Sequence, residues 1–86
     1  MNTQTLEQYV RTKNAWRKLV NKAPLSLDNA ADRQKIADDL DSSLSPENLT
    51  CDGELPRSQV QKKYRILTKC AAELKALDPS VTMWEY

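Results

Sequence analysis

The sequence lacks histidine and phenylalanine and contains a single glycine, Gly53. Histidine is the commonest general base and the commonest metal ligand in proteins, so its absence removes the usual groups for acid–base catalysis and for a metal site. Serine–histidine and cysteine–histidine pairs are excluded for the same reason. One glycine cannot form a glycine-rich phosphate loop. We therefore expect a protein that is not an enzyme and that uses no cofactor, no metal and no small-molecule substrate.

Cysteine is also scarce, since Cys51 and Cys70 are the two in the chain. Their separation fits neither a C-x-x-C motif nor a zinc spacing, and small secreted domains usually carry more cysteines. The first residues lack the basic and apolar regions of a signal peptide, and no apolar run approaches the ~18 residues of a membrane span. We expect a soluble cytoplasmic protein with no membrane partner, in which Cys70 is a small buried apolar residue.

The chain is short, with 86 residues, of which 40% are hydrophobic and 29% charged. This length supports one modest hydrophobic core. The apolar residues recur at helical spacing, and no stretch of useful length shows the alternation of a strand. The sequence predicts a single all-α domain over residues 1–86, built as a small three-helix bundle with an extra short helical turn and an ordered or docking C-terminal tail.

The first predicted helix covers residues 5–22. Its apolar residues recur every three or four positions and trace one helix face. Thr3 or Thr5 offers an N-cap, and Pro24 prevents further extension. We expect this face, with Trp16, to pack in the core. The apolar residues of the pattern are Leu6, Tyr9, Val10, Trp16, Leu19, Val20 and Ala23.

The second predicted helix covers residues 28–44, with Ser26 or Asp28 as its cap. Its last turns carry three aspartates, where the helix macrodipole is negative and favours basic side chains. We expect either fraying there or basic groups elsewhere that offset the charge. The cluster lacks the alternating loop of a calcium hand, so we interpret it as a solvated face. The three residues are Asp38, Asp39 and Asp41.

A short helical turn is predicted at residues 46–50, because Pro46 follows the cap residue Ser45. Gly53 then supplies a turn that tolerates positive φ. The third long helix is predicted over residues 58–77. It opens with a capping box at residues 58–61. Its apolar face is formed by Val60, Tyr64, Leu67, Ala71 and Leu74, broadened by Ile66, Cys70 and Leu77.

The tail over residues 79–86 is too apolar for a plain disordered end. We expect it either to fold back over the first helix or to reach another chain. Its large side chains are of the kind enriched at the centres of interfaces. They are Met83, Trp84 and Tyr86, and Val81 is a further apolar residue of the tail.

The net charge of +1 conceals three blocks of opposite sign. Residues 1–25 hold five basic and one acidic residue, residues 26–55 two basic and eight acidic, and residues 56–86 six basic and three acidic, which gives +4, −6 and +3. Either the acidic block pairs with the basic helices inside the bundle, or the charges are used across an interface. Exposed pairs inside the fold contribute only ~0–1 kcal/mol each.

The leading functional hypothesis is a small non-enzymatic regulatory or adaptor protein that binds another protein, or itself as a homodimer. Its size, lack of catalytic groups and charge blocks are typical of small bacterial or phage regulatory proteins. Charged helix faces steer the approach, and the aromatic tail supplies most of the affinity. The proposed contacts are Arg11, Lys18, Asp38, Asp39, Asp41, Trp84 and Tyr86, with the basic residues Lys62, Arg65 and Lys69.

The alternative is a DNA-associated regulator that uses the start of the third helix. Basic and amide side chains in the first turns of a helix are the types that contact phosphates and base edges in the major groove. The acidic middle of the chain opposes this, because it repels a phosphate backbone. The residues proposed for nucleic-acid binding are Arg57, Ser58, Gln61, Lys62 and Arg65.

Overall fold

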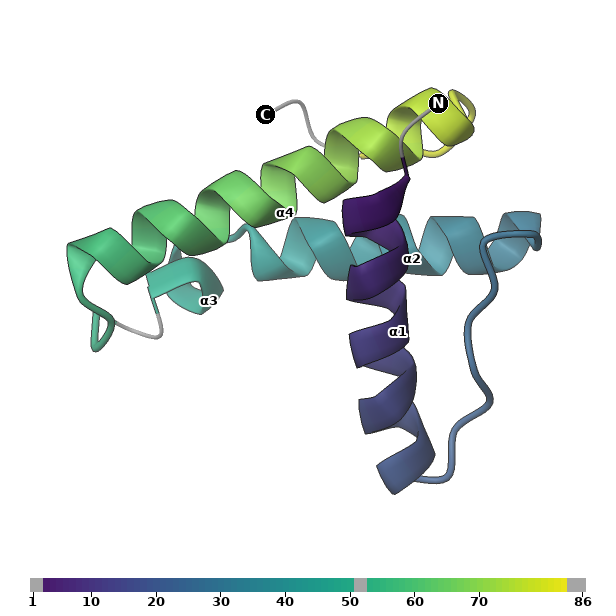
Figure 1. Cartoon of the computed structure of the whole chain (residues 1–86), viewed down its shortest axis with the longest axis horizontal. Helices are drawn as coiled ribbons and strands as arrows, with labels where there is room; N and C mark the ends of the chain where they lie inside the picture. The colour runs from purple at the N-terminus through teal and green to yellow at the C-terminus, as the bar shows by residue number, and fades with distance from the viewer. Residues whose placement is uncertain (1–2, 51–52, 84–86) are drawn as a thin grey trace.

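The computed structural model describes residues 3–50 and 53–83. Within them the chain forms helices and no strand, which confirms the all-α prediction. Helices α2 and α4 lie side by side, and α1 crosses them near its N-terminal end and then projects away from both (Figure 1). The short helix α3 sits where predicted. The helices are α1 (Gln4–Leu19), α2 (Ala30–Ser43), α3 (Pro46–Thr50) and α4 (Arg57–Leu77).

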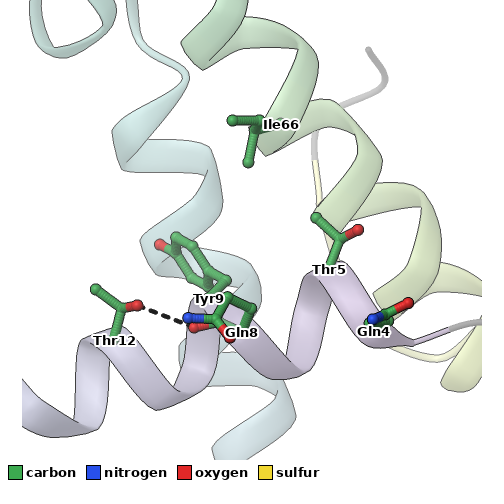
Figure 2. A pocket seen from close by; sticks show the side chains of 6 residues that line it. All are labelled: Gln4, Thr5, Gln8, Tyr9, Thr12 and Ile66. Carbon is green, nitrogen blue, oxygen red and sulfur yellow. Dashed lines mark hydrogen bonds between the residues drawn. The ribbon is translucent and has the colours of Figure 1, made fainter.

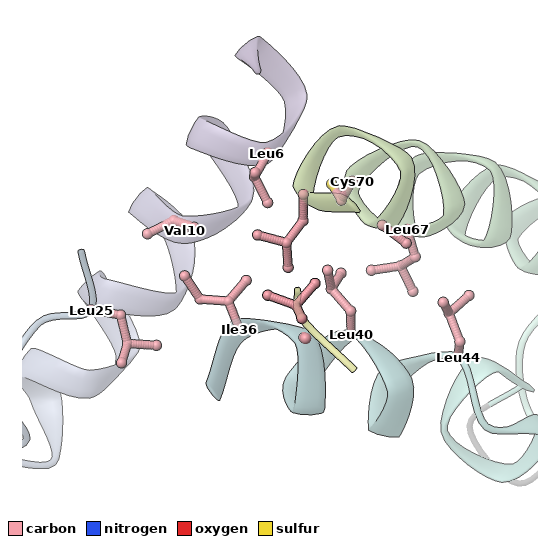
Figure 3. Close-up of a cluster of buried hydrophobic side chains, with 12 residues drawn as sticks. Leu6, Val10, Leu25, Ile36, Leu40, Leu44, Leu67 and Cys70 are labelled. Carbon is pink, nitrogen blue, oxygen red and sulfur yellow. The ribbon is translucent and has the colours of Figure 1, made fainter. Parts of the chain in front are cut away.

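The hydrophobic core lies where α1 crosses α2 and α4 (Figure 3). Helix α1 contributes only Leu6 and Val10 as buried residues, both from its N-terminal half. The rest comes mainly from α2 and α4, so the second half of α1 takes no part in the core. The core residues are Leu6, Val10, Leu25, Ile36, Ala37, Leu40, Leu44, Leu67, Cys70, Ala71, Leu74 and Val81.

The N-terminal end of α1 is capped by a side chain from α4. Thr3 occupies the N-cap position but makes no capping hydrogen bond with its side chain. Instead, Glu73 Oε1 accepts hydrogen bonds from the backbone N–H groups of Thr5, at 3.1 Å, and Leu6, at 3.2 Å. A carboxylate is favourable there because the helix N-terminus carries partial positive charge. Thr3 is therefore the N-cap residue, as predicted, but the capping hydrogen bonds come from Glu73 and join two helices.

Cys70 lies one turn before Glu73 on α4 and is fully buried, as predicted. Its thiol donates to the carbonyl oxygen of Thr5 at 3.6 Å. Burial, and then the nearby Glu73, raise the pKa of Cys70 to about 11, which keeps the thiol protonated. Cys70 is therefore a packing residue beside the end of α1. Cys51 lies outside the described residues.

Helix α1 ends at Leu19, three residues before the predicted end. Asn21 adopts a left-handed conformation with φ of 59°. Its N–H donates to Lys18 O at 3.2 Å, and the N–H of Lys22 donates to Arg17 O at 2.8 Å. These two bonds form a Schellman motif, which asparagine supports because it tolerates the left-handed region. The chain therefore turns back before Pro24 has any effect on the helix.

Helix α2 begins two residues later than predicted. Its cap is Asn29, whose side chain accepts from the Asp32 N–H at 3.1 Å. The Asp32 carboxylate in turn accepts from the Ser26 N–H at 3.0 Å. The predicted caps Ser26 and Asp28 thus belong to the preceding turn, where Ser26 Oγ accepts from the Asp28 N–H at 3.2 Å.

Helix α4 begins at Arg57, directly after Pro56, and has no capping hydrogen bond from a side chain. Ser58 lies inside the first turn, so the predicted capping box does not form. Gly53 does occupy a turn with φ of 86°, as predicted. A larger residue there would be strained by its backbone conformation alone, because no atom lies within 4 Å of an added Cβ.

The end of the described chain folds back onto α2, not onto the first helix. Val81 is buried in the core. The Gln34 side chain on α2 donates to Thr82 O and accepts from the Thr82 N–H, both at 3.0 Å. Lys75 Nζ donates to Val81 O at 2.9 Å. Residues 79–83 are therefore part of the fold, while Trp84 and Tyr86 lie outside the described residues.

An ion pair between Asp78 and Arg33 fixes the start of this segment. Arg33 Nε lies 2.6 Å from Asp78 Oδ2, and a second Arg33 nitrogen donates to Leu27 O at 2.8 Å. Asp78 Oδ1 accepts from the hydroxyl and the N–H of Ser80. The Ser80 hydroxyl, followed by Arg33, lowers the pKa of Asp78 to about 2.

Asp78→Asn tests this anchor. Because the folded-state pKa is depressed from 3.8 to about 2, the ionised carboxylate stabilises the fold at neutral pH, and this stability is lost as the pH falls through that range. We expect wild type to be more stable than Asp78→Asn in urea unfolding at pH 7, with the difference fading at about pH 2. Glu47→Gln, on the exposed surface of α3, is the control. An equal difference between wild type and Asp78→Asn at both pH values would contradict the account.

Candidate protein-binding surface

Three large apolar side chains are exposed together on the projecting half of α1. Trp16 is 66% exposed, Leu19 75% and Val20 60%. Their spacing of three and four places them on one helix face. We refer to Trp16, Leu19 and Val20 as the α1 patch. The prediction that Trp16 lies in the core is wrong, because the buried residues of α1 are in its N-terminal half and the helix carries this face beyond α2 and α4 (Figure 1).

The segment that follows α1 packs on a different side of the helix and leaves the α1 patch open. Asn14 exchanges two hydrogen bonds with the backbone of Leu25, at 2.9 and 2.7 Å. Arg17 Nε donates to Ala23 O at 2.7 Å. Asn14 precedes Trp16 by two positions and therefore points to the opposite side of α1. The return segment is thus held away from the patch.

A groove of about 520 Å³ lies between α1 and α4, next to the α1 patch. Figure 2 shows the side chains that line it, with α4 contributing Ile66 above the row from α1. Ile66 is 47% exposed and Tyr64 44% exposed, so these two residues of the apolar face predicted for residues 58–77 are not buried. The lining residues are Gln4, Thr5, Gln8, Tyr9, Thr12 and Ile66.

Tyr9 lies in this groove and is uncharged at physiological pH. Its hydroxyl oxygen is buried and lacks a hydrogen bond of ordinary geometry within the described chain. Burial raises the pKa of Tyr9 to about 12; the neighbouring Ser43 side chain acts to lower it, and the Asp39 carboxylate to raise it. Lys13 Nζ lies 5.6 Å from the ring centroid. The structure therefore places an acidic residue of α2 beside a largely apolar groove.

Within residues 3–50 and 53–83, Arg11 and Lys18 do not form the ion pairs with the acidic block that the bundle interpretation expects. Arg11 and Lys18 are exposed on α1, and neither pairs with a carboxylate among residues 3–50 and 53–83. Asp38 is exposed and accepts from the Gln34 amide at 3.1 Å. The ion pair Arg33–Asp78 joins a basic residue of the acidic block to an acidic residue of the third block. The expected pairing was the opposite, between carboxylates of the acidic block and basic residues of the other two blocks.

The residues proposed for nucleic-acid binding are exposed along the outer face of α4, away from the core. Positions 58, 61, 62 and 65 recur at helical spacing and share this face, which Lys69 extends. Position 57 lies at its start. The structure thus brings them together as a polar stripe, consisting of Arg57, Ser58, Gln61, Lys62, Arg65 and Lys69.

In the described part of the chain, no group of three or more cysteine or acidic side chains is arranged to hold a metal ion. None of the described helices is both long enough and apolar enough to cross a membrane.

No protein-family model, no curated protein and no solved structure matches this chain.

Proposed function

We propose that this protein is a non-enzymatic binding module that docks another protein chain on the α1 patch and the groove beside it. The observation that carries the proposal is the exposure of Trp16, Leu19 and Val20 on one face of a projecting helix. Single exposed apolar residues are ordinary, whereas a contiguous group is typical of an interaction site. Tryptophan is also among the residues that contribute most to binding when buried at an interface.

The unpaired charges support the same proposal. Arg11 and Lys18 on α1, and Asp38 on α2, remain exposed without an ion pair in the described structure. Charges arranged this way steer the approach of a partner and select its orientation more than they add affinity. The affinity then comes from covering the α1 patch, a role that the sequence alone assigned to the tail.

The test is capture of partners from the source organism by wild type and by Trp16→Ala/Leu19→Ser. Both replaced side chains are exposed, so the fold should survive, which circular dichroism verifies. We expect at least one protein to be captured by wild type and lost with the double variant. Tyr64→Ala, which removes an exposed aromatic residue from α4, is the matched control. Identical captured proteins for all three chains would contradict the proposal.

Nucleic-acid binding is a second candidate, favoured by the polar stripe on α4. Lys62, Arg65 and Lys69 are all exposed there and unpaired with carboxylates among the residues described. Helix α3, which precedes this helix, has only five residues. The geometry therefore differs from a helix-turn-helix, and the stripe would act mainly through phosphate contacts.

Titration with duplex DNA at low and moderate salt tests this candidate. If the stripe binds phosphates, affinity falls with salt, and the triple variant Arg57→Ala/Lys62→Ala/Arg65→Ala lowers the salt dependence by up to about 2.7 log units per decade, since each contact contributes about 0.9. Arg11→Ala/Lys18→Ala, on another helix, serves as the control. Absence of binding at low salt, or equal binding by the triple variant, would exclude this function.

A further inference from the structure

The α1 patch and the groove occupy one continuous face of a single helix. Trp16 lies four positions after the groove residue Thr12, and Leu19 lies three positions after Trp16, so all three residues share one face of α1. The groove is at the N-terminal half of α1, where Ile66 of α4 forms its other wall. The projecting side chains are at the C-terminal half. A hollow and a projection therefore lie at the two ends of the same surface.

A surface of this kind is complementary to a copy of itself that is turned around. If two α1 helices pack antiparallel on this face with their centre near Thr12, each Trp16 lies opposite Gln8 and Tyr9 of the other helix. The groove, at about 520 Å³, falls in the size range that holds a small organic ligand and has room for an indole ring. Both contacts form at once, which closes the assembly as a two-fold dimer.

Resting on the proposed function above, we propose that the occupant of this surface is a second copy of the chain. In this dimer the α1 patch of each copy enters the α1–α4 groove of the other. The interface is isologous, so each copy contributes the same residues twice.

The distribution of charge favours the antiparallel arrangement. Asp39 lies beside Tyr9 at the groove, and its own chain gives it no cationic partner in the described region. The arrangement brings the basic C-terminal half of one α1, with Lys13 one turn before Trp16, over the groove of the second copy. A base of one chain then approaches Asp39 of the other, and opposite charges steer this orientation.

Repulsion between the two basic helices is limited by where their other cations lie. Lys18 follows Trp16 by two positions and therefore points to the opposite side of α1. Arg11 shares that side, because it lies seven positions from Lys18. Both are thus directed away from the proposed seam.

Covering the groove leaves the hydroxyl of Thr12 paired. Thr12 Oγ1 donates to Gln8 O at 3.0 Å within α1 (Figure 2). The hydroxyl proton therefore keeps its acceptor when a second copy excludes water, which avoids the cost of an unsatisfied buried donor. Position 12 is consequently suited to the centre of an interface.

The first experiment measures mass by sedimentation equilibrium from micromolar to sub-millimolar concentrations. We expect wild type to form a species of twice the 9.8 kDa of one chain. Trp16→Ala should raise the dimer dissociation constant about tenfold or more, as loss of a central tryptophan does at interfaces. Tyr64→Ala should leave it unchanged. A wild type that stays monomeric, or a dimer indifferent to Trp16→Ala, overturns the proposal.

The second experiment tests the antiparallel register in a Cys51→Ser background, where the remaining Cys70 is buried. Thr12→Cys should form a disulfide-linked dimer under mild oxidation, because the two positions face each other at the two-fold axis. Arg11→Cys, one position away and on the far side, should not. Cross-linking of Arg11→Cys but not of Thr12→Cys overturns this geometry.

Two further results separate this inference from the broader proposed function. If the wild type is monomeric and captures a protein that Trp16→Ala does not capture, the dimer is overturned and the binding module is supported. A monomer that sediments with phosphatidylglycerol vesicles only when Trp16 is present overturns the dimer in favour of a lipid surface. If neither mass nor capture depends on Trp16, the inference and the proposed function both fail.

Discussion

The carboxylate of Glu73 holds the N-terminal end of α1 against α4, and the placement of the rest of α1 follows from it. Glu73 is only 8% exposed, and one of its oxygens accepts two backbone N–H groups of α1 that would otherwise be buried without a partner. The contact fixes Leu6 in the core beside Cys70. With that end fixed and α1 crossing the other helices, the second half of the helix extends past them (Figure 1).

The two halves of α1 therefore serve different purposes. Leu6 and Val10 are buried and stabilise the fold, while the apolar side chains of Trp16 and Leu19 are exposed on the surface. A small chain has little apolar surface to spare for its own stability. The exposure of Trp16 in such a chain is explained if a second chain buries it in an interface. The segregated charge fits the same division, because the basic end of α1 is carried away from the acidic residues of α2.

The sequence predicts the helices well and their surroundings less well. Short local patterns correctly predicted α3, where a proline follows a cap residue, and the turn at Gly53. Asn21 carried a readable signal for the end of α1, since asparagine tolerates a left-handed conformation. No local pattern could predict the cap formed by Glu73, because the Glu73 carboxylate that accepts from Thr5 lies 68 residues away along the chain. Periodicity identified the apolar face of α1, but it cannot show whether another element covers that face, and so Trp16 was misplaced.

The most direct test of this account is the solvent accessibility of Trp16, measured by acrylamide quenching of its fluorescence in a Trp84→Phe variant. The account predicts strong quenching in dilute solution, where α1 projects alone, and weaker quenching as rising concentration allows a second copy to cover the patch. Weak quenching in the dilute monomer would mean that Trp16 is already packed within its own chain. That result would contradict a helix that is anchored at one end and used for binding at the other.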